Sequence, residues 1–309
     1  MLKMDRLFIR KDEIIMNQRL IDLHVHSTKS DGTLTPQEVV CAASTAGLSA
    51  IALTDHDTVS GVADAAGTAA ALGIELVPGI EFSTEYALSG SSEGKEVHIV
   101  GLFIDPDNPL LLEKTNEFRE CRNGRNAKMV AALQKEGFSI TMDELIAANP
   151  DSIITRANIA RFLYETGQVK SVQKVFEKYI GDGCRCFIGR FKVSPLEAVE
   201  LIHAAGGVAI LAHPLLYHLK PAALQQLIDT LKQARLDGIE AVYSTHSAAD
   251  EQYVKNLAGK NGLLISGGSD FHGENKPSIR LGSGHGNLRV PYEILADLRK
   301  RHEALTRKV

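Results

Sequence analysis

The sequence predicts an α/β fold, in the form of a distorted barrel of seven strand–helix units interrupted by a helical insertion. Strand-like and helix-like segments alternate along most of the chain, which is the pattern of a sheet of parallel strands. The alternation stops between about residues 105 and 190, where several helix-like segments follow one another. We therefore expect residues 17–105 and 190–309 to form the barrel and residues 106–189 to form a helical lid.

Seven segments have the apolar, β-branched composition of buried strands, and this number suggests a closed barrel more than an open sheet. They are residues 19–26, 50–55, 74–80, 97–104, 207–213, 238–244 and 262–270. Two intervening helices have readable starts. Thr35 and Ser194 each precede a proline and stand three residues before a glutamate, as in a capping box. Gly47 and Gly206 are placed to end these helices.

The insertion is predicted to contain only helices, interrupted by Gly137 and Pro150 as helix breakers. The helices are expected over roughly residues 108–136, 141–149, 155–166 and 170–180. At the other end of the sequence, residues 1–16 are assigned as an N-terminal extension, because Met16 immediately precedes the first convincing strand. Whether residues 1–15 are native or come from an upstream start is left open.

Composition and charge exclude several classes of protein. Lys and Arg number 34 against 38 Asp and Glu, a formal charge of -4, so no global basic field is available to hold a long nucleic acid. We find no apolar run long enough to span a bilayer and no signal peptide. The four cysteines are scattered, as is usual for reduced thiols. We therefore expect a cytoplasmic protein that captures a small anionic partner, without a membrane partner; its oligomeric state is left open.

Histidines and carboxylates fall at or near the ends of most predicted strands. Alternation along the first strand places Asp22, His24 and His26 on one face. The others are Asp31, His56, Glu81, His98, His213, Asp270 and His272. Because the C-terminal ends of parallel barrel strands converge on one mouth, we expect these residues to meet there. Imidazole and carboxylate ligands together favour Mn, Fe or Zn over Mg or Ca.

Several segments, in this order and spacing, resemble the signature motifs of the PHP (polymerase and histidinol phosphatase) superfamily. They are HVHSTKSDGTLTP, LTDHDTVSG, VPGIEFS, VHIVGLFID, LAHP and GGSDFHG, within residues 20–104 and 190–285. With the helical insertion, they are most similar to the stand-alone PHP phosphoesterases. That subgroup includes 3',5'-nucleotide bisphosphate phosphatases and 5'-3' exoribonucleases acting on short RNA. The resemblance implies a distorted TIM-like barrel of seven strands with a trinuclear metal centre.

The resemblance also implies a metal-binding role for particular residues, and every expected ligand has the expected residue type. The first metal would be held by His24, His26, Glu81 and Asp270. The second, bridged by the same glutamate, would be held by Glu81, His98 and His213. The third would be held by Asp31, His56 and His272. We expect two to three divalent ions, with Mn favoured and Fe or Zn as alternatives.

The activity implied by the resemblance is hydrolysis of phosphate monoesters of small nucleotides by a metal-activated hydroxide. The main expectation is release of the 3'-phosphate of a 3',5'-bisphosphate such as adenosine 3',5'-bisphosphate (pAp). The alternatives are 5'-3' removal of nucleotides from short RNA and, less well matched by the insertion pattern, hydrolysis of histidinol phosphate. A metal-dependent sensor without turnover is disfavoured by the complete ligand set. Asp270 and His246 are the catalytic candidates beyond metal binding, with a purely ligating role for Asp270 left open.

Candidate substrate contacts lie in the insertion and after the sixth strand. Arg156 occupies the position where the subgroup has a phosphate-binding arginine, although Asn158 here replaces the subgroup's usual histidine. The other candidates are Lys178, Arg190, Ser244 and His246. For Lys178 and Arg190, an ordinary surface charge is an equal alternative.

For two further groups of charged residues, the sequence leaves two roles open. Asp22, Asp55 and Asp57 either orient metal-bound imidazoles or serve as ordinary strand-end carboxylates. A row of basic residues spaced by three is predicted to form a salt-bridged face with nearby glutamates, although one of its arginines could reach a nucleotide phosphate. The row comprises Arg119, Arg122, Arg125 and Lys128.

Overall fold

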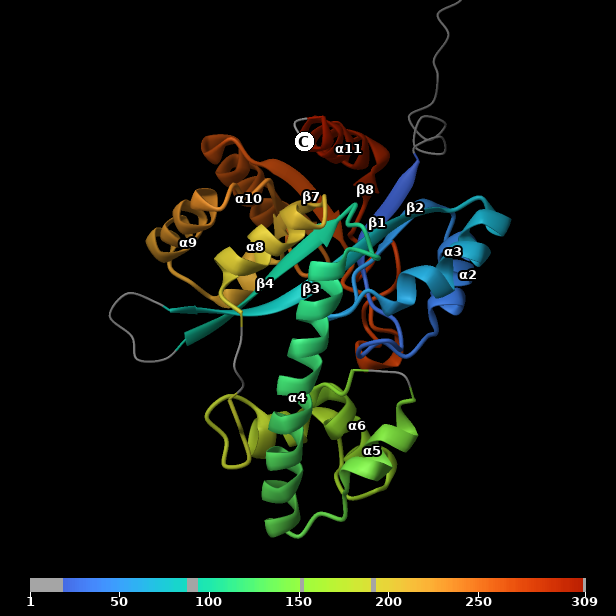
Figure 1. Cartoon of the computed structure of the whole chain (residues 1–309), viewed down its shortest axis with the longest axis vertical. Helices are drawn as coiled ribbons and strands as arrows, with labels where there is room; N and C mark the ends of the chain where they lie inside the picture. The colour runs from blue at the N-terminus through green and yellow to red at the C-terminus, as the bar shows by residue number, and fades with distance from the viewer. Residues whose placement is uncertain (1–18, 88–93, 151–152, 190–192, 308–309) are drawn as a thin grey trace, which may run out of the picture.

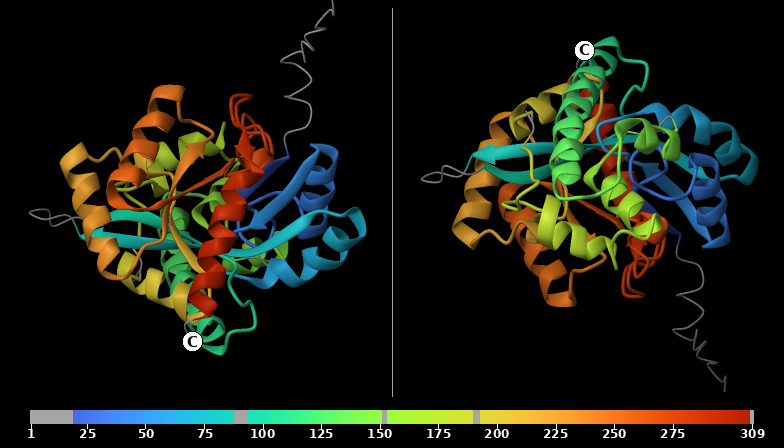
Figure 2. Two further views of the ribbon diagram at one scale, coloured as in Figure 1. Left: turned by 90° about the horizontal axis from the view of Figure 1, so that it is seen from above. Right: turned by 90° about the horizontal axis from the view of Figure 1, so that it is seen from below.

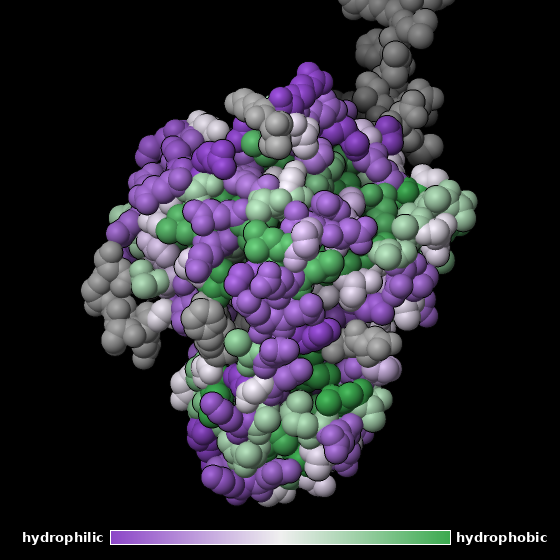
Figure 3. Space-filling view, viewed as in Figure 1, coloured by the Kyte–Doolittle hydropathy of each residue, from purple (hydrophilic) through white to green (hydrophobic). Residues whose placement is uncertain are grey.

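The fold is built around one curved sheet surrounded by helices, with a second group of helices at one end (Figure 1). The computed structural model describes residues 19–87, 94–150, 153–189 and 193–307. The predicted N-terminal extension and Arg190 therefore lie outside the described residues. Within the described residues, no helix combines the length and apolar character needed to cross a bilayer. Figure 3 shows hydrophilic and hydrophobic residues interspersed over both the barrel and the lid, as on most folded proteins.

All seven predicted strands are present, and a short eighth strand joins them in the sheet order β7-β6-β5-β4-β3-β2-β1-β8. The strands are β1 (Leu20–Val25), β2 (Leu48–Leu53), β3 (Glu75–Ala87), β4 (Gly94–Leu102), β5 (Val208–Leu211), β6 (Gly238–Tyr243), β7 (Leu264–Gly268) and β8 (Val290–Pro291). The barrel nearly closes where the ends of β1 and β7 meet. There His26 N–H donates to the Phe271 carbonyl over 3.0 Å, and Asp270 N–H donates to the His24 carbonyl over 2.8 Å.

Strand β4 runs antiparallel to both of its neighbours, so the expectation of an all-parallel barrel is wrong at this strand. The six residues between Ala87 and Gly94 are too few for the crossover that parallel pairing requires. β3 and β4 instead form a long hairpin. His98 consequently lies within β4, opposite Ser83, and not at the start of a parallel strand.

Helices cover the outside of the barrel, as Figure 2 shows from two sides. They are α2 (Pro36–Thr45), α3 (Ser60–Leu72), α8 (Pro195–Ala204), α9 (Pro221–Gln233), α10 (Ala248–Asn261) and α11 (Tyr292–Thr306). Both predicted capping boxes are present, at the starts of α2 and α8. Gly47 and Gly206 follow these helices in the left-handed conformation, with φ of 74° and 78°.

The described part of the predicted lid, residues 106–150 and 153–189, is a group of helices with an apolar cluster of its own. The exact boundaries of this lid stay a prediction. Its elements are α4 (Pro109–Lys135), α5 (Met142–Ala148), α6 (Arg156–Glu165), α7 (Val172–Val175) and the π-helical turn η1 (Phe176–Ile180). Met129, Leu133 and Ile159 belong to its cluster. The first turns of α4 pack on the barrel, because Leu111 and Phe118 belong to the barrel's apolar core. The long α4 helix therefore connects the two groups of elements.

Candidate metal centre and adjoining pocket

Glu81, on β3, is the centre of a buried cluster of histidines. Its Oε1 lies 2.9 Å from His98 Nδ1 and 3.0 Å from His213 Nε2. Its Oε2 lies between 3.1 and 3.3 Å from imidazole nitrogens of three further residues, His24, His26 and His56. One carboxylate thus faces imidazoles on both sides, which is the geometry of a residue that bridges two cations.

Asp31 and Asp270 extend the cluster in two other directions. Asp31 Oδ1 lies 3.2 Å from His272 Nε2 and 3.8 Å from His56 Nε2. Asp270 Oδ1 lies 3.4 Å from His26 Nε2 and 3.3 Å from His272 Nδ1. The structure therefore brings every sequence-predicted metal ligand into one continuous cluster.

The atoms at the centre of this cluster have the surroundings expected of metal ligands. Four of them are buried without a hydrogen-bond partner in the part of the chain that the structure describes: His24 Nε2, His26 Nε2, Asp31 Oδ1 and Glu81 Oε2. A buried polar atom left in this state is costly unless something else binds it. Divalent cations bound at more than one position would satisfy all four, and the nitrogen and carboxylate donors suit Mn, Fe or Zn.

The donor atoms divide into three overlapping groups, each within 4.8 Å. The groups are His26, Asp31, His56 and His272; His24, His26 and Glu81; and His56, Glu81 and His98. These groups, found among the described residues, differ in membership from the three metal positions implied by the resemblance. His26 and His56 each belong to two groups, and the predicted ligands His213 and Asp270 belong to none. The number of metal ions therefore stays a prediction.

Charges in the cluster compensate one another. Burial opposes protonation of His26 and His98, but the adjacent carboxylates raise the pKa of each imidazole to about 9. Burial dominates at His56 and lowers its pKa to about 3. Burial alone would raise the pKa of Glu81, but the surrounding histidines hold that pKa well below its ordinary value. Protons on His26 and His98 thus supply positive charge that metal ions would replace on binding.

Glu240, on β6, supports the cluster and is missing from the sequence predictions. Its Oε1 lies 3.0 Å from His24 Nδ1, and its Oε2 accepts the His213 backbone N–H over 2.8 Å. A carboxylate that accepts a hydrogen bond from the imidazole nitrogen facing away from the metal fixes the orientation and tautomer of a metal-binding histidine. A single acid within the otherwise apolar strand sequence GIEAVY was the signal that could have identified it.

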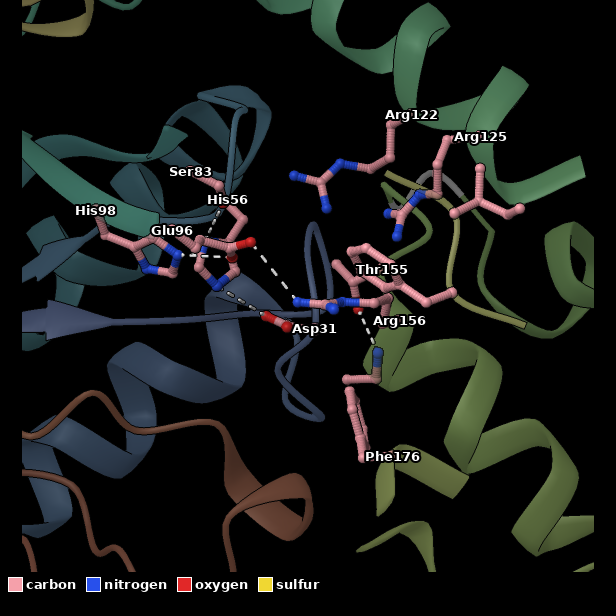
Figure 4. Close-up of a pocket in the computed structure, with 13 residues that line it drawn as sticks. Asp31, His56, Ser83, Glu96, His98, Arg122, Arg125, Thr155, Arg156 and Phe176 are labelled. Carbon is pink, nitrogen blue, oxygen red and sulfur yellow. Dashed lines mark hydrogen bonds and ion pairs between the residues drawn. The ribbon is translucent and has the colours of Figure 1, made fainter. Parts of the chain in front are cut away.

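A pocket extends from the cluster toward the lid (Figure 4). The barrel side of this pocket includes Asp31, His56 and His98. The lid contributes three arginines: Arg122 and Arg125 from α4 and Arg156 from α6. The pocket thus has metal-binding groups on one side and cationic groups on the other, which suits an anionic ligand.

The positions of the α4 arginines correct the prediction of a salt-bridged face. Arg122 and Arg125 are only 5% and 7% exposed, and Arg122 pairs with Asp57. One face of α4 is covered by the barrel and the lid, and a row spaced by three turns around the helix, so the row cannot remain entirely on the solvent side. The exposed pairing on this helix instead joins Lys114 to Glu117.

The PHP domain profile matches residues 22–184. The chain belongs to this family. A 5'-3' exoribonuclease of Haemophilus influenzae is 37% identical to the chain over 81% of it and 89% of the relative. A 3',5'-nucleoside bisphosphate phosphatase of Chromobacterium violaceum is 38% identical over 82% of this chain and 87% of that protein. The resemblance read from the sequence motifs is therefore confirmed.

Solved structures agree with the family assignment and confirm the predicted fold class. An amidohydrolase from Chromobacterium violaceum matches with a TM-score of 0.78 at 36% identity, covering 91% of this chain and 96% of that one. A protein assigned as a metal-dependent phosphoesterase from Bifidobacterium adolescentis matches with a TM-score of 0.79 at 27% identity, covering 92% and 96%.

In this PHP domain, two side chains donate hydrogen bonds to the Asp270 oxygen that faces away from the histidines, and they favour its ionised form. Its Oδ2 accepts a hydrogen bond of 2.7 Å from the Tyr243 hydroxyl and one of 2.6 Å from Lys276 Nζ. Burial would raise its pKa, but Lys276 and the nearby histidines keep that pKa well below the ordinary value. This arrangement favours the ligating role of Asp270 over the proton relay, which stays a prediction. Lys276 is a second supporting residue that the sequence predictions lack.

The aspartates considered as imidazole partners hold loops of the PHP barrel. Asp55 accepts hydrogen bonds of 2.8 Å from Ser27 N–H and 2.6 Å from the Ser30 hydroxyl, which fixes the turn between His26 and Asp31. Asp22 accepts from the backbone N–H groups of Ser269 and Gly282, each over 2.8 Å. Asp57 accepts from Ser83 N–H over 3.1 Å and pairs with Arg122. Asp22 and Asp55 therefore act as strand-end carboxylates that hold loops, and not as carboxylates that orient imidazoles.

The remaining substrate candidates differ in where they lie. Lys178 is exposed on η1 and is outside the pocket lining. Ser244 is buried and donates to the Ser269 carbonyl over 2.6 Å, so its hydroxyl proton is engaged within the barrel. His246 is buried, with Nδ1 2.8 Å from the Ala241 carbonyl, and is also outside the lining. The roles of Ser244 and His246 stay predictions, and the position of Lys178 gives its role no support.

Asn158, the residue that replaces the subgroup's usual histidine, lies in the first turn of α6. Its Oδ1 accepts from the Thr155 backbone N–H and hydroxyl, each over 2.7 Å, and Thr155 caps the helix in return. Asn158 faces away from the arginine pocket, because it lines other hollows between lid and barrel. Asn158 therefore stabilises the first turn of the helix that carries Arg156.

Proposed function

We propose that the chain is a metal-dependent phosphoesterase that releases the 3'-phosphate of small 3',5'-nucleotide bisphosphates. The observation that carries the proposal is a single pocket with a metal-ligand cluster on the barrel side and three arginines on the lid side. A substrate with two phosphate groups engages both sides at once. The relative from Chromobacterium violaceum, named a 3',5'-nucleoside bisphosphate phosphatase, supports this substrate class.

The proposed metal ligands are those predicted from the sequence: His24, His26, Asp31, His56, Glu81, His98, His213, Asp270 and His272. They fit two to three divalent ions, with Mn favoured and Fe or Zn as alternatives. Such ions, when bound, supply Lewis acidity and an activated water for attack on phosphorus. Glu81 would bind them through both of its oxygens, and Glu240 would hold the His24 ring in the orientation for binding.

Arg156 is the proposed ligand of the phosphate that is not cleaved. Its guanidinium lies 2.6 Å from Asp182 Oδ1 and 3.6 Å from Glu96 Oε2. A phosphate with two negative charges competes well with these carboxylates, because guanidinium binds phosphate in a bidentate manner. Arg122 and Arg125 are buried beside it and add positive charge where water is scarce.

A second candidate function is 5'-3' removal of nucleotides from short RNA. Relatives from Haemophilus influenzae and Escherichia coli, 37% and 34% identical, carry the name 5'-3' exoribonuclease. The same lid arginines would then hold the 5'-terminal phosphate while the metal centre faces the first phosphodiester. The formal charge of -4 favours a short substrate over a long nucleic acid.

We also propose a cytoplasmic location without a membrane partner. The four cysteines, Cys41, Cys121, Cys184 and Cys186, are all free thiols. Free thiols are usual for proteins of reducing compartments. Phosphorylated nucleotides are abundant in the same compartment.

The test is a comparison of three substrates with protein that has been stripped of metal and reloaded separately with Mn, Fe or Zn. The substrates are pAp, a 5'-phosphorylated RNA tetramer and histidinol phosphate. We expect the highest kcat/KM on pAp. Absence of turnover on all three substrates with every metal would refute the enzymatic proposal, and a strong preference for histidinol phosphate would refute the nucleotide assignment.

A further inference from the structure

One part of the pocket is aromatic, and neither the metal cluster nor the arginines account for it. Phe176, Phe187 and Ile188 line the pocket next to Arg156. Phe176 and Ile188 also pack against the lid's apolar cluster, whereas Phe187 is not among the residues of that cluster. Figure 4 shows Phe176 on the lid side, across from His56 on the barrel side. Both phenylalanines are partly exposed. A ligand that enters the pocket between lid and barrel therefore meets aromatic carbon as well as charge.

The chain segment that carries the two rings is fixed by its own hydrogen bonds. Phe176 begins the π-helical turn η1, an irregular helix type that often occurs at functional sites. Gly181 N–H closes this turn on the Phe176 carbonyl over 2.9 Å. Phe187 N–H donates to the Cys184 carbonyl over 2.9 Å, and Cys186 between them is 1% exposed in the lid cluster. The backbone that carries both rings is thus held in place by the lid itself.

Phe187 is placed differently from an aromatic residue that serves the lid core. Phe138 and Tyr179 illustrate the core arrangement, with their rings edge to face at 4.9 Å. The ring of Phe187 instead lies 5.6 Å from the guanidinium carbon of Arg156. Arg156 therefore contacts an aromatic face and is available to a phosphate in the same pocket. A phosphate next to a flat aromatic surface matches the arrangement of a nucleotide, in which phosphate and base are joined by one sugar.

We propose that Phe176 and Phe187 form a stacking site for the nucleobase of the substrate, an inference that rests on the proposed function. Stacking on an aromatic face is available to every base, so the site accepts purine and pyrimidine nucleotides and discriminates against phosphate esters without a base. Specificity for nucleotides then comes from the lid, whereas cleavage comes from the barrel.

The experiment compares pAp with its stable abasic analogue, a tetrahydrofuran 3',5'-bisphosphate. We expect Phe187→Ala to lower kcat/KM on pAp by roughly 5- to 100-fold, the range that base stacking implies, and to leave the abasic analogue within about twofold. Phe187→Trp, which keeps a stacking surface, should restore activity on pAp. The matched control is Tyr164→Ala, because Tyr164 is a lid aromatic that is 50% exposed on α6 outside the pocket.

Failure of this inference can be separated from failure of the proposed function. An unchanged kcat/KM on pAp, or an equal loss on both substrates, overturns the stacking site while wild-type turnover of pAp keeps the proposed function. Absence of wild-type turnover overturns the proposed function itself. Calorimetric binding of AMP then decides the stacking site: weaker binding by Phe187→Ala but not by Tyr164→Ala supports it, and equal binding by all three proteins overturns it.

Discussion

The barrel and the lid contribute different chemistry to one pocket. The barrel supplies histidines and carboxylates, which are buried and held by one another around Glu81. The lid supplies three arginines and Phe176 from helices, and Phe187 from the irregular segment after η1, and these residues line the same pocket. The difference indicates that the reaction is set by the barrel and the choice of substrate by the lid. Substitutions in the two regions should therefore have separable effects.

The largest effect is expected for Glu81→Gln in the barrel. This change weakens the bridge between two groups of histidines, so we expect loss of bound metal and a decrease in kcat of roughly 1000-fold or more, given the several kcal/mol that metal ions supply. Elemental analysis and steady-state kinetics measure the two consequences. Binding of AMP through the lid should remain detectable. Retention of full metal content and activity would show that Glu81 is not central to the site.

A smaller effect of another kind is expected for Arg156→Ala in the lid. Loss of a charge-assisted contact to phosphate should lower kcat/KM on pAp by about 10- to 100-fold while metal content stays unchanged. Arg156→Lys should recover part of the loss, because the charge remains but the bidentate geometry does not. Unchanged kinetics, or loss of metal together with activity, would contradict the separation between lid and barrel.

Glu240→Gln tests whether metal binding in the barrel also depends on residues that do not line the pocket. We expect metal affinity to fall by about 10- to 100-fold, the usual cost of losing a carboxylate behind a metal-binding histidine. Activity should return at high metal concentration. Titration of the apoprotein with Mn measures the affinity, with the exposed Glu113→Gln on α4 as control. Equal metal affinity in both variants would remove Glu240 from the support of the site.

The smallest effect is expected for Asp237, which belongs neither to the metal-ligand cluster nor to the arginine pocket. Its carboxylate accepts from His203, the Ala209 backbone and Arg301 at 2.7–2.8 Å. Burial would raise its pKa, but these donors lower the pKa below the ordinary value of 3.8 for an aspartate. A lowered folded-state pKa adds stability above pH 3.8 that is lost as pH falls through the folded pKa.

Asp237→Asn should therefore reduce the free energy of unfolding by about 1–3 kcal/mol at pH 7, without changing metal affinity. The difference from the wild type should narrow below about pH 4. Urea unfolding of both proteins at several pH values provides the measurement. A difference that does not depend on pH would show that the ionised carboxylate is not the source of the stability.

The contrast between the regions also explains what the sequence could predict. Strand ends fix where a side chain points, so His24, His26 and the other ligands could be placed from spacing and family motifs alone. The antiparallel direction of β4 could have been inferred from the short connection after Ala87. Glu240 was not identified, because its role depends on a contact between residues 216 positions apart.

Prediction was weaker for the lid, although its helices were placed within a few residues. The inward face of a helix depends on what packs against it, and spacing along α4 could not show that Arg122 and Arg125 turn toward the barrel. Phe187 lies in an irregular segment after η1, where no period indicates a face. Asn158 acts through a helix cap that only the local geometry reveals.

The most direct test of the division between barrel and lid uses two substrates that differ by one phosphate. We would measure kcat/KM on pAp and on 3'-AMP for the wild type and for Arg156→Ala. Both substrates carry the 3'-phosphate that is cleaved at the metal centre, but only pAp carries a 5'-phosphate for the lid. We expect the wild type to prefer pAp by at least about tenfold and the variant to lose most of this preference. A wild type without the preference, or a variant that keeps it, would contradict the account.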